Sequence, residues 1–339
     1  MSATRVPDAR RTSIRERLSW QRAADFVLIL ATIAEAIVFA TIAPGFGTVA
    51  NLVNIALSIA VTGILAVGMT AVILTGGIDL SVGSLVALTG TAAAMAAAAV
   101  PGAGAAGIVA LVVAIAVGAI AGMLNGSFIA YLRVQPFVAT LAMLTIARGA
   151  AFILSGGRSI GNLPDSFGVL GRSVPFGIPA PVYVFAAVAV IGAFVLNRTV
   201  FGRRVYATGG NPEASWLAGV GTQRVIWLVY ALNGVLAGLA GLTLASRLGA
   251  GVPNSGLQYE LDVIAAVVVG GTSLAGGRGT IVGTIWGTVF IGVLTNGLNL
   301  ANVDPYVQKI ALGVVILIAA IGDRVAGRST GGPGTGHGA

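Results

Sequence analysis

The sequence has few charged residues, no cysteine and a single histidine. Charged residues make up 9% of its 339 residues and hydrophobic residues 56%, whereas a soluble domain has about 25% charged residues. The absence of cysteine excludes disulfides and thiolate metal sites. The histidine, His337, lies in a glycine-rich tail, where we expect neither a catalytic nor a proton-relay role. With no nucleophile–base pair or metal-ligand cluster in the sequence, we expect no catalytic residue, metal or cofactor, and the composition predicts a polytopic membrane protein.

The net charge of +8 does not indicate a nucleic-acid partner. The arginines do not form a basic face with interleaved aromatic residues. They lie in the gaps between apolar segments, which is the pattern of residues that set the orientation of a membrane protein.

The apolar segments predict an all-α fold with about ten transmembrane helices of roughly 20 residues each. The first segment is longer than the core of a signal peptide, so we expect an uncleaved first span. Gly118, Gly122 and Gly126 are spaced by four residues, as are Gly234 and Gly238, which predicts close helix packing. The predicted spans are 26–43, 51–74, 81–100, 105–131, 136–154, 181–197, 223–246, 261–275, 279–299 and 306–322.

The distribution of arginine predicts that both termini are cytoplasmic. This orientation places most of the basic residues inside, including those of a basic N-terminal arm (1–25) and of a long loop (198–222). The apolar transmembrane domain covers 26–322, and residues 323–339 form a low-complexity tail that we expect to be cytoplasmic and disordered.

Two similar sequence patterns predict a 5 + 5 inverted repeat. Asn125-Gly126 is followed by VQPFV at 134–138, and Asn296-Gly297 is followed by VDPYV at 303–307. In the predicted topology the first pattern faces the cytoplasm and the second faces outside. The alternative is that asparagine, glycine and proline simply gather at helix ends.

The glycine-rich segment 271–278 is not a phosphate-binding loop. Such a loop needs a lysine after its second glycine, followed by serine or threonine. Here Arg278 follows the glycines, and Lys309 is the only lysine in the chain. If ATP drives this protein, another subunit must bind it.

The segment Gly76–Ser84 places an acidic residue and hydroxyls at a break between apolar spans. Polar groups freed by such a break must be satisfied by protein or line a wet cavity. Asp79 and Ser81 therefore have two open interpretations, a gate or pathway element and a structural cap of the following helix. We add the asparagines of the two repeated patterns, Asn125 and Asn296, as candidate pathway or gate residues.

Glu35 and Arg148 fall inside predicted spans. Ionisable groups in a membrane are costly and are usually paired or face water. We predict an intramembrane ion pair between them, with a role in helix packing favoured over a coupling-ion site.

The polar segment Gly202–Val220 predicts a short helix that is held by a partner. Asn211 is suited to cap it, Pro212 to its first position, Glu213 to its N-terminal dipole and Gly219 to its end. A helix of about two turns is not stable alone, so we expect it to dock on another protein.

Four ordered motifs together resemble the ribose-type sugar permeases of bacterial ABC importers. They lie at 76–90, 125–157, 202–220 and 263–287, and the resemblance covers about residues 45–322. It implies a permease subunit of the bacterial inner membrane that translocates a monosaccharide or related small polar solute. It also implies three kinds of partner: a second permease subunit (identical or homologous), an ATP-binding subunit and an extracytoplasmic sugar-binding protein.

The resemblance further implies which residues contact the ATP-binding subunit. They form a coupling helix consisting of Asn211, Pro212, Glu213, Ala214, Ser215, Trp216 and Leu217. The alternative function is an ion-coupled secondary transporter, which Glu35, Asp79 and the repeat suggest.

Overall fold

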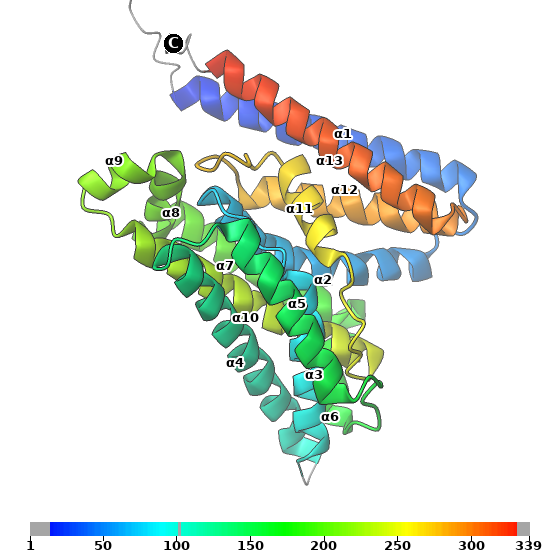
Figure 1. Ribbon diagram of the computed structural model, residues 1–339. Coiled ribbons are helices and arrows are strands. Elements are labelled where there is room, and N and C mark those ends of the chain that lie inside the picture. Colours follow the sequence, from blue (N-terminus) through cyan, green and yellow to red (C-terminus); the bar gives the residue numbers. More distant parts are fainter. Residues whose placement is uncertain (1–13, 101–102, 331–339) are drawn as a thin grey trace, which may run out of the picture.

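The computed structural model describes residues 14–100 and 103–330, and this part of the chain is helical with no strand (Figure 1). A single isolated bridge joins Ile160 and Gly251. The helices are α1 (Ile14–Ile42), α2 (Val49–Leu74), α3 (Val82–Ala98), α4 (Ala103–Ala130), α5 (Pro136–Ser155), α6 (Asp165–Arg172), η1 (Pro175–Gly177), α7 (Ala180–Arg198), α8 (Val200–Gly210), α9 (Pro212–Leu217), α10 (Thr222–Leu248), α11 (Tyr259–Val269), α12 (Ile281–Leu300) and α13 (Pro305–Thr330).

Within the described residues, seven helices are long and apolar enough to cross a membrane, namely α2, α4, α5, α7, α10, α12 and α13. Two shorter apolar helices are α3 and the part of α1 from Phe26 to Ile42. The prediction of a polytopic all-α membrane protein is therefore confirmed. The inverted repeat stays a prediction, although the proline of each repeated pattern does open a helix, α5 at Pro136 and α13 at Pro305.

The predicted span 261–275 differs most from the structure. Its helix, α11, has only 11 residues, whereas a span needs about 20. Gly270 ends the helix, and Gly271 follows in the left-handed conformation with φ +81°. The chain then runs without helix to Thr280, so α11 reaches only part of the way across.

The predicted ends of the chain also differ. The helix α1 begins at Ile14, within the segment predicted as an arm, and α13 continues to Thr330, beyond the predicted end of the last span. Residues 1–13 and 331–339, which include His337, lie outside the described residues.

The core of the bundle is built around α10, which packs on α2, α3 and α4. A Cβ added at Gly118 of α4 would lie 2.2 Å from the carbonyl oxygen of Gly234 on α10, and one at Gly122 would lie 2.3 Å from that of Tyr230. The two helices approach so closely because small residues face each other. The predicted packing role of these glycines is confirmed.

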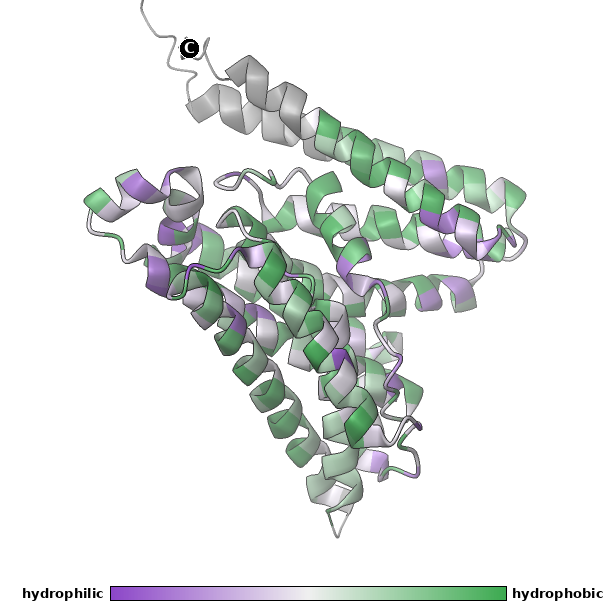
Figure 2. Ribbon diagram, viewed as in Figure 1, coloured by the Kyte–Doolittle hydropathy of each residue, from purple (hydrophilic) through white to green (hydrophobic). Residues whose placement is uncertain are grey.

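The helices α1 and α13 both lie at the edge of the bundle beyond α12 (Figure 1), where α1 packs on α12, and α13 packs on α11 and α12. Figure 2 shows mostly hydrophobic residues along the described part of α1 and α13, while hydrophilic residues gather at α8 and α9. We call the end of the bundle that carries α8, α9, the α2–α3 turn (75–81) and the α11–α12 loop (270–280) the α9 end. These segments contact one another there, as Gly277 N donates to Leu74 O at 2.9 Å.

Candidate functional site

The helix α9 has the caps that the sequence predicted. Asn211 is extended (φ −160°), and its Oδ1 accepts a hydrogen bond from Ala214 N at 2.9 Å. Pro212 occupies the first turn with Glu213, whose negative charge suits the N-terminal end of the helix dipole. Gly219 then takes a left-handed conformation, and Val220 N donates to Ser215 O at 2.9 Å.

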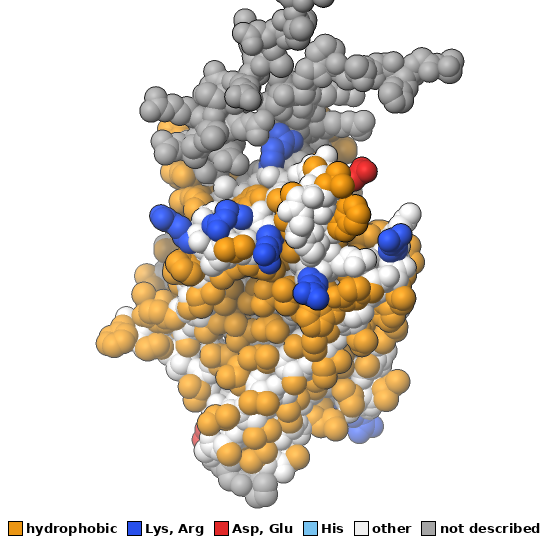
Figure 3. All heavy atoms as spheres, turned by 90° about the vertical axis from the view of Figure 1, so that its left-hand side faces the viewer, with side chains coloured by type: hydrophobic (Ala, Val, Ile, Leu, Met, Phe, Trp, Pro, Cys, Tyr) orange, Lys and Arg blue, Asp and Glu red, His pale blue; other side chains and the backbone are white. Residues whose placement is uncertain are grey.

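The surface of α9 exposes two large apolar side chains. Trp216 is 66% exposed and Leu217 is 73% exposed, while Ser215 is the buried residue of the helix. Figure 3 shows basic side chains spread across the same end of the molecule, above an apolar surface. Exposed arginines close to α9 in sequence are Arg198, Arg203, Arg204 and Arg224. An apolar tip among basic residues is suited to contact a protein partner.

The helix α8 attaches α9 to the bundle and was not predicted. Its residues Val205 and Thr208 are buried, and Gly202 packs on the end of α7, where an added Cβ would lie 2.1 Å from Leu196 O. Tyr206 donates a hydrogen bond to Gly279 O at 2.9 Å. Burial raises the pKa of the Tyr206 phenol, so the group stays a neutral donor.

A buried polar cluster lies behind the α9 end and centres on Asp79, which is fully buried. Its Oδ1 accepts hydrogen bonds from Ser81 N at 2.9 Å and from Ser81 Oγ at 2.5 Å. Its Oδ2 accepts one from Asn233 Nδ2 of α10 at 2.8 Å. Asn125 of α4 donates from Nδ2 to Ser81 Oγ at 3.0 Å. Three of the four predicted pathway residues are therefore together.

The turn between α2 and α3, which contains Asp79, is also held by hydrogen bonds to its backbone. Tyr230 of α10 and Thr140 of α5 each donate a hydrogen bond to the carbonyl oxygen of Ile78 at 3.3 Å. The turn between α2 and α3 is thus bonded to α4, α5 and α10. Because a buried polar group without a partner is costly, these bonds fix the position of the turn.

The structure shows how Asp79 relates to the helix that follows it. The helix α3 begins at Val82, and Ser81 occupies the cap position without a side-chain bond to the helix. Asp79 lies outside the helix and binds the N–H and hydroxyl of Ser81. It is therefore the centre of the cluster and not the helix cap, while a gating role stays a prediction.

Asn296 lies apart from this cluster. It forms a reciprocal amide pair with Asn51 of α2, with the two Nδ2–Oδ1 distances at 2.9 and 3.0 Å. Asn51 also donates to Phe46 O at 2.9 Å. Asn51 lies near the start of α2, whereas the segment that carries the Asp79 cluster follows the end of α2. The asparagine pair and the Asp79 cluster are therefore at opposite ends of this helix.

The structure does not bring Glu35 and Arg148 together. Arg148 Nη1 donates to Pro253 O and to Ser255 O, both at 2.8 Å, and the opposite charge that acts on it is Glu260. Glu35 Oε1 is buried and has no hydrogen-bond partner within the described residues. Arg148 thus holds the segment before α11. Its partners there are backbone carbonyl oxygens, which the sequence pattern does not reveal.

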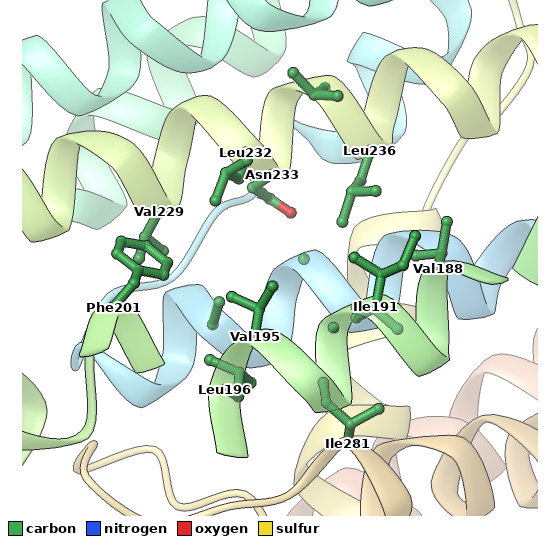
Figure 4. A pocket seen from close by; sticks show the side chains of 15 residues that line it. Val188, Ile191, Val195, Leu196, Phe201, Val229, Leu232, Asn233, Leu236 and Ile281 are labelled. Carbon is green, nitrogen blue, oxygen red and sulfur yellow. The ribbon is translucent and has the colours of Figure 1, made fainter. Parts of the chain in front are cut away.

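A cavity of about 190 Å³ lies between α2, α7 and α10 (Figure 4). Its lining is apolar except for Asn233, which points from α10 toward the other helices. Asn233 Oδ1 has no hydrogen-bond partner in the part of the chain that the structure describes, while its Nδ2 is bonded to Asp79. Asn233 is thus the one polar side chain that the lining of this cavity offers.

The sequence reasoning missed Asn233 and Tyr230. Both lie in the apolar segment 223–246, spaced by three residues, which places them on one face of a helix. Polar residues inside an apolar span signal buried partners or a functional path. That signal was available, but the partner of each residue depends on how the helices pack.

The chain is similar to known permeases over most of its length. A family model described as branched-chain amino acid transport system / permease component matches residues 51–320. The chain is 43% identical to a ribose import permease protein of Escherichia coli, over 94% of this chain and 98% of the relative. It is 44% identical to a ribose import permease protein of Bacillus subtilis, over 85% and 89%.

A third relative is an L-arabinose transport system permease protein of Escherichia coli, 37% identical over 83% of this chain and 84% of the relative. These relatives give no support to an ion-coupled secondary transporter. No solved structure matches the chain. The chain therefore belongs to the family of branched-chain amino acid transport system permease components, and within it to the ribose-type sugar permeases of ABC importers, which are translocation subunits and not enzymes.

Proposed function

We propose that this chain forms the membrane path of an importer for a monosaccharide of the pentose class. In this proposal α9 contacts an ATP-binding subunit, whose movement powers transport. The observation that carries the substrate class is the similarity to ribose and L-arabinose permeases over more than four-fifths of the chain. An ABC permease of this family works with ATP-binding and substrate-binding partners. We expect the binding protein, and not the apolar cavity, to select the sugar.

The proposed orientation places α9 and both termini in the cytoplasm. Basic residues gather at the α9 end (Figure 3), and basic residues favour the cytoplasmic side. The ATP-binding subunit is cytoplasmic in this arrangement, so the exposed Trp216 and Leu217 meet it directly.

The contact itself is a helix in a groove. Short helices bind partners by burying an apolar face in a hydrophobic groove. Trp216 and Leu217 supply such a face, and the Asn211 cap holds the helix in shape before the partner binds. Binding then costs little conformational entropy, because the helix is already formed.

The translocation path forms between two permease subunits, identical or homologous. No residue of α13 from Pro305 to Gly322 is fully buried within the described chain, and the exposed residues include Ile310, Val314 and Leu317. Such apolar surface is suited to lipid or to a second subunit. In the proposed mechanism ATP binding brings the ATP-binding subunits together, α9 moves with them, and the path changes which side it opens to.

Uptake by the complete system tests this function. The permease, the ATP-binding subunit and the binding protein are reconstituted in vesicles, and uptake of labelled ribose and arabinose is measured with and without ATP. We expect uptake that needs ATP and persists with an uncoupler. Uptake that stops with the uncoupler and continues without the ATP-binding subunit would refute the proposal in favour of ion coupling.

A further inference from the structure

Three pairs of glycines from distant parts of the sequence meet at the α9 end. Gly76-Gly77 follows α2, Gly209-Gly210 ends α8, and Gly276-Gly277 lies in the α11–α12 loop. We call five of these residues, all except Gly210, the glycine junction, because a Cβ added at Gly210 would have nothing within 4 Å. A backbone hydrogen bond from Gly277 N to Leu74 O, 2.9 Å long, ties the loop to the end of α2.

The glycine junction is a contact between backbones. A Cβ added at Gly209 would lie 1.7 Å from Leu74 O and 2.8 Å from Gly277 N. One added at Gly276 would lie 2.9 Å from Gly209 O and 3.0 Å from Gly76 N. No side chain fits between these segments, so their relative position does not depend on flexible rotamers.

On one side the glycine junction leads directly into α9. Gly210 is followed by Asn211, the cap of α9, so the last residue of α8 and the first of α9 are separated by one position. The bond from Tyr206 to Gly279 O holds α8 to the α11–α12 loop a second time. A displacement of α9 therefore reaches Gly209 across only two residues of chain.

On the other side the glycine junction leads into the Asp79 cluster. Gly77 is separated from Asp79 only by Ile78, whose carbonyl accepts the bonds from Tyr230 and Thr140. Tyr230 also covers Gly77, because a Cβ added there would lie 2.5 Å from the tyrosine hydroxyl oxygen. The cluster then reaches α4 and α10 through Asn125 and Asn233.

We propose that the glycine junction is a rigid backbone joint that passes the displacement of α9 to the Asp79 cluster and so to α4, α5 and α10. Gly209, Gly276 and Gly77 are then positioning residues for coupling ATP hydrolysis to sugar movement. Close-packed segments move together because they cannot be compressed, and a hydrogen-bonded turn moves with the helices that hold it. This inference rests on the proposed contact between α9 and the ATP-binding subunit.

The test compares two neighbouring substitutions in the reconstituted importer. Gly209→Ala adds a methyl group at the contact, whereas Gly210→Ala, the matched control, adds one where nothing lies within 4 Å. The readouts are co-purification of the ATP-binding subunit, ATP hydrolysis, and sugar transported per ATP. We expect Gly209→Ala to keep the partner and hydrolyse ATP but to lower the sugar transported per ATP by about tenfold, as overpacking shifts the joint. We expect Gly210→Ala to match the original chain.

A cross-link tests the rigid joint without relying on a substitution that disturbs its packing. Because the chain has no cysteine, Gly210→Cys and Ala275→Cys introduce the only two thiols, one on each side of the joint. A short bis-maleimide then connects them. If the joint is rigid, the linked protein transports as well as either single-cysteine variant.

These outcomes separate the two proposals. Equal sugar per ATP in Gly209→Ala and Gly210→Ala, or loss of transport on cross-linking, refutes the rigid joint. Failure of the α9 contact has a different signature, since charged substitutions at Trp216 and Leu217 would then leave co-purification of the ATP-binding subunit unchanged.

Discussion

Asn233 donates a hydrogen bond from Nδ2 to Oδ2 of Asp79 at 2.8 Å, and both side chains are fully buried. The pair joins α10 to the α2–α3 turn across 154 positions of sequence. Its partners leave no acceptor atom of the carboxylate unbonded, since Ser81 occupies Oδ1. The bond is therefore one of the few polar links that fix the turn against the central helix.

Replacing Asn233 by leucine should destabilise the protein more than its change of volume explains. The substitution removes a donor and leaves a buried carboxylate oxygen without a partner, which costs about 1–3 kcal/mol or more. We expect a lower apparent melting temperature in detergent. The double variant Asn233→Leu with Asp79→Leu should lose less than the sum of the single variants, because neither partner is then left alone. Additive losses would contradict a direct interaction.

Replacing Gly234 by alanine should impair folding of the bundle. The added methyl group would lie 2.2 Å from Gly118 O and 2.8 Å from Gly122 Cα, which are backbone atoms that cannot move aside alone. We expect a cost of about 1–3 kcal/mol and a smaller yield of monodisperse protein in size-exclusion chromatography. Gly149→Ala is the control, because that glycine of α5 has nothing within 4 Å. An equal yield of both variants would contradict the close α4–α10 contact.

The sequence is sufficient to predict the helical membrane fold, because long apolar runs have few other stable structures. The caps of α9 are also local, and Asn211, Pro212 and Gly219 act as predicted. The length of α11 is harder to predict from the sequence. An apolar run such as 261–275 does not reveal that Gly270 must face Gly283, where an added Cβ would lie 2.4 Å from a carbonyl oxygen.

Contacts between helices explain the rest of what the sequence missed. Asp79, Ser81 and Asn125 are recognisable as polar residues in apolar surroundings, but Asn233 becomes their partner only when α10 packs on α3 and α4. Arg148 finds backbone carbonyls of Pro253 and Ser255, which no charge pattern marks. The prediction from opposite charges therefore paired Arg148 with Glu35, to which it is not bonded.

Arg148 and Glu35 should behave independently. Arg148→Leu removes two hydrogen bonds to the segment before α11, so we expect a lower apparent melting temperature and reduced transport. Glu35→Gln removes a charge that has no bonded partner at Oε1 and should preserve transport. The effects of the double variant on melting temperature should be additive, as expected for groups without a shared partner. Loss of transport in Glu35→Gln would instead support a coupling-ion role.

The binding of α9 to the ATP-binding subunit should depend on the apolar character of its exposed side chains, and not only on their exposure. Trp216→Asp and Leu217→Asp place a charge where an apolar groove is expected, and desolvating an unpaired charge is costly. We expect each variant to lose at least about tenfold of the co-purified ATP-binding subunit, a loss of about 1.4 kcal/mol, and the double variant to lose nearly all of it. Membrane insertion should be normal, because both side chains are exposed and make no core contact.

Phe176→Asp is the matched control for the α9 variants. Phe176 is 98% exposed and lies in η1, between α6 and α7 and outside α9. Its backbone is left-handed (φ 53°), a conformation that aspartate accepts more readily than phenylalanine. We expect this variant to retain the ATP-binding subunit, because η1 precedes α7 and the proposed topology places it outside. Equal loss from Phe176→Asp and Trp216→Asp would show that any exposed aromatic residue matters, and normal co-purification in both α9 variants would remove the basis for assigning α9 as the contact.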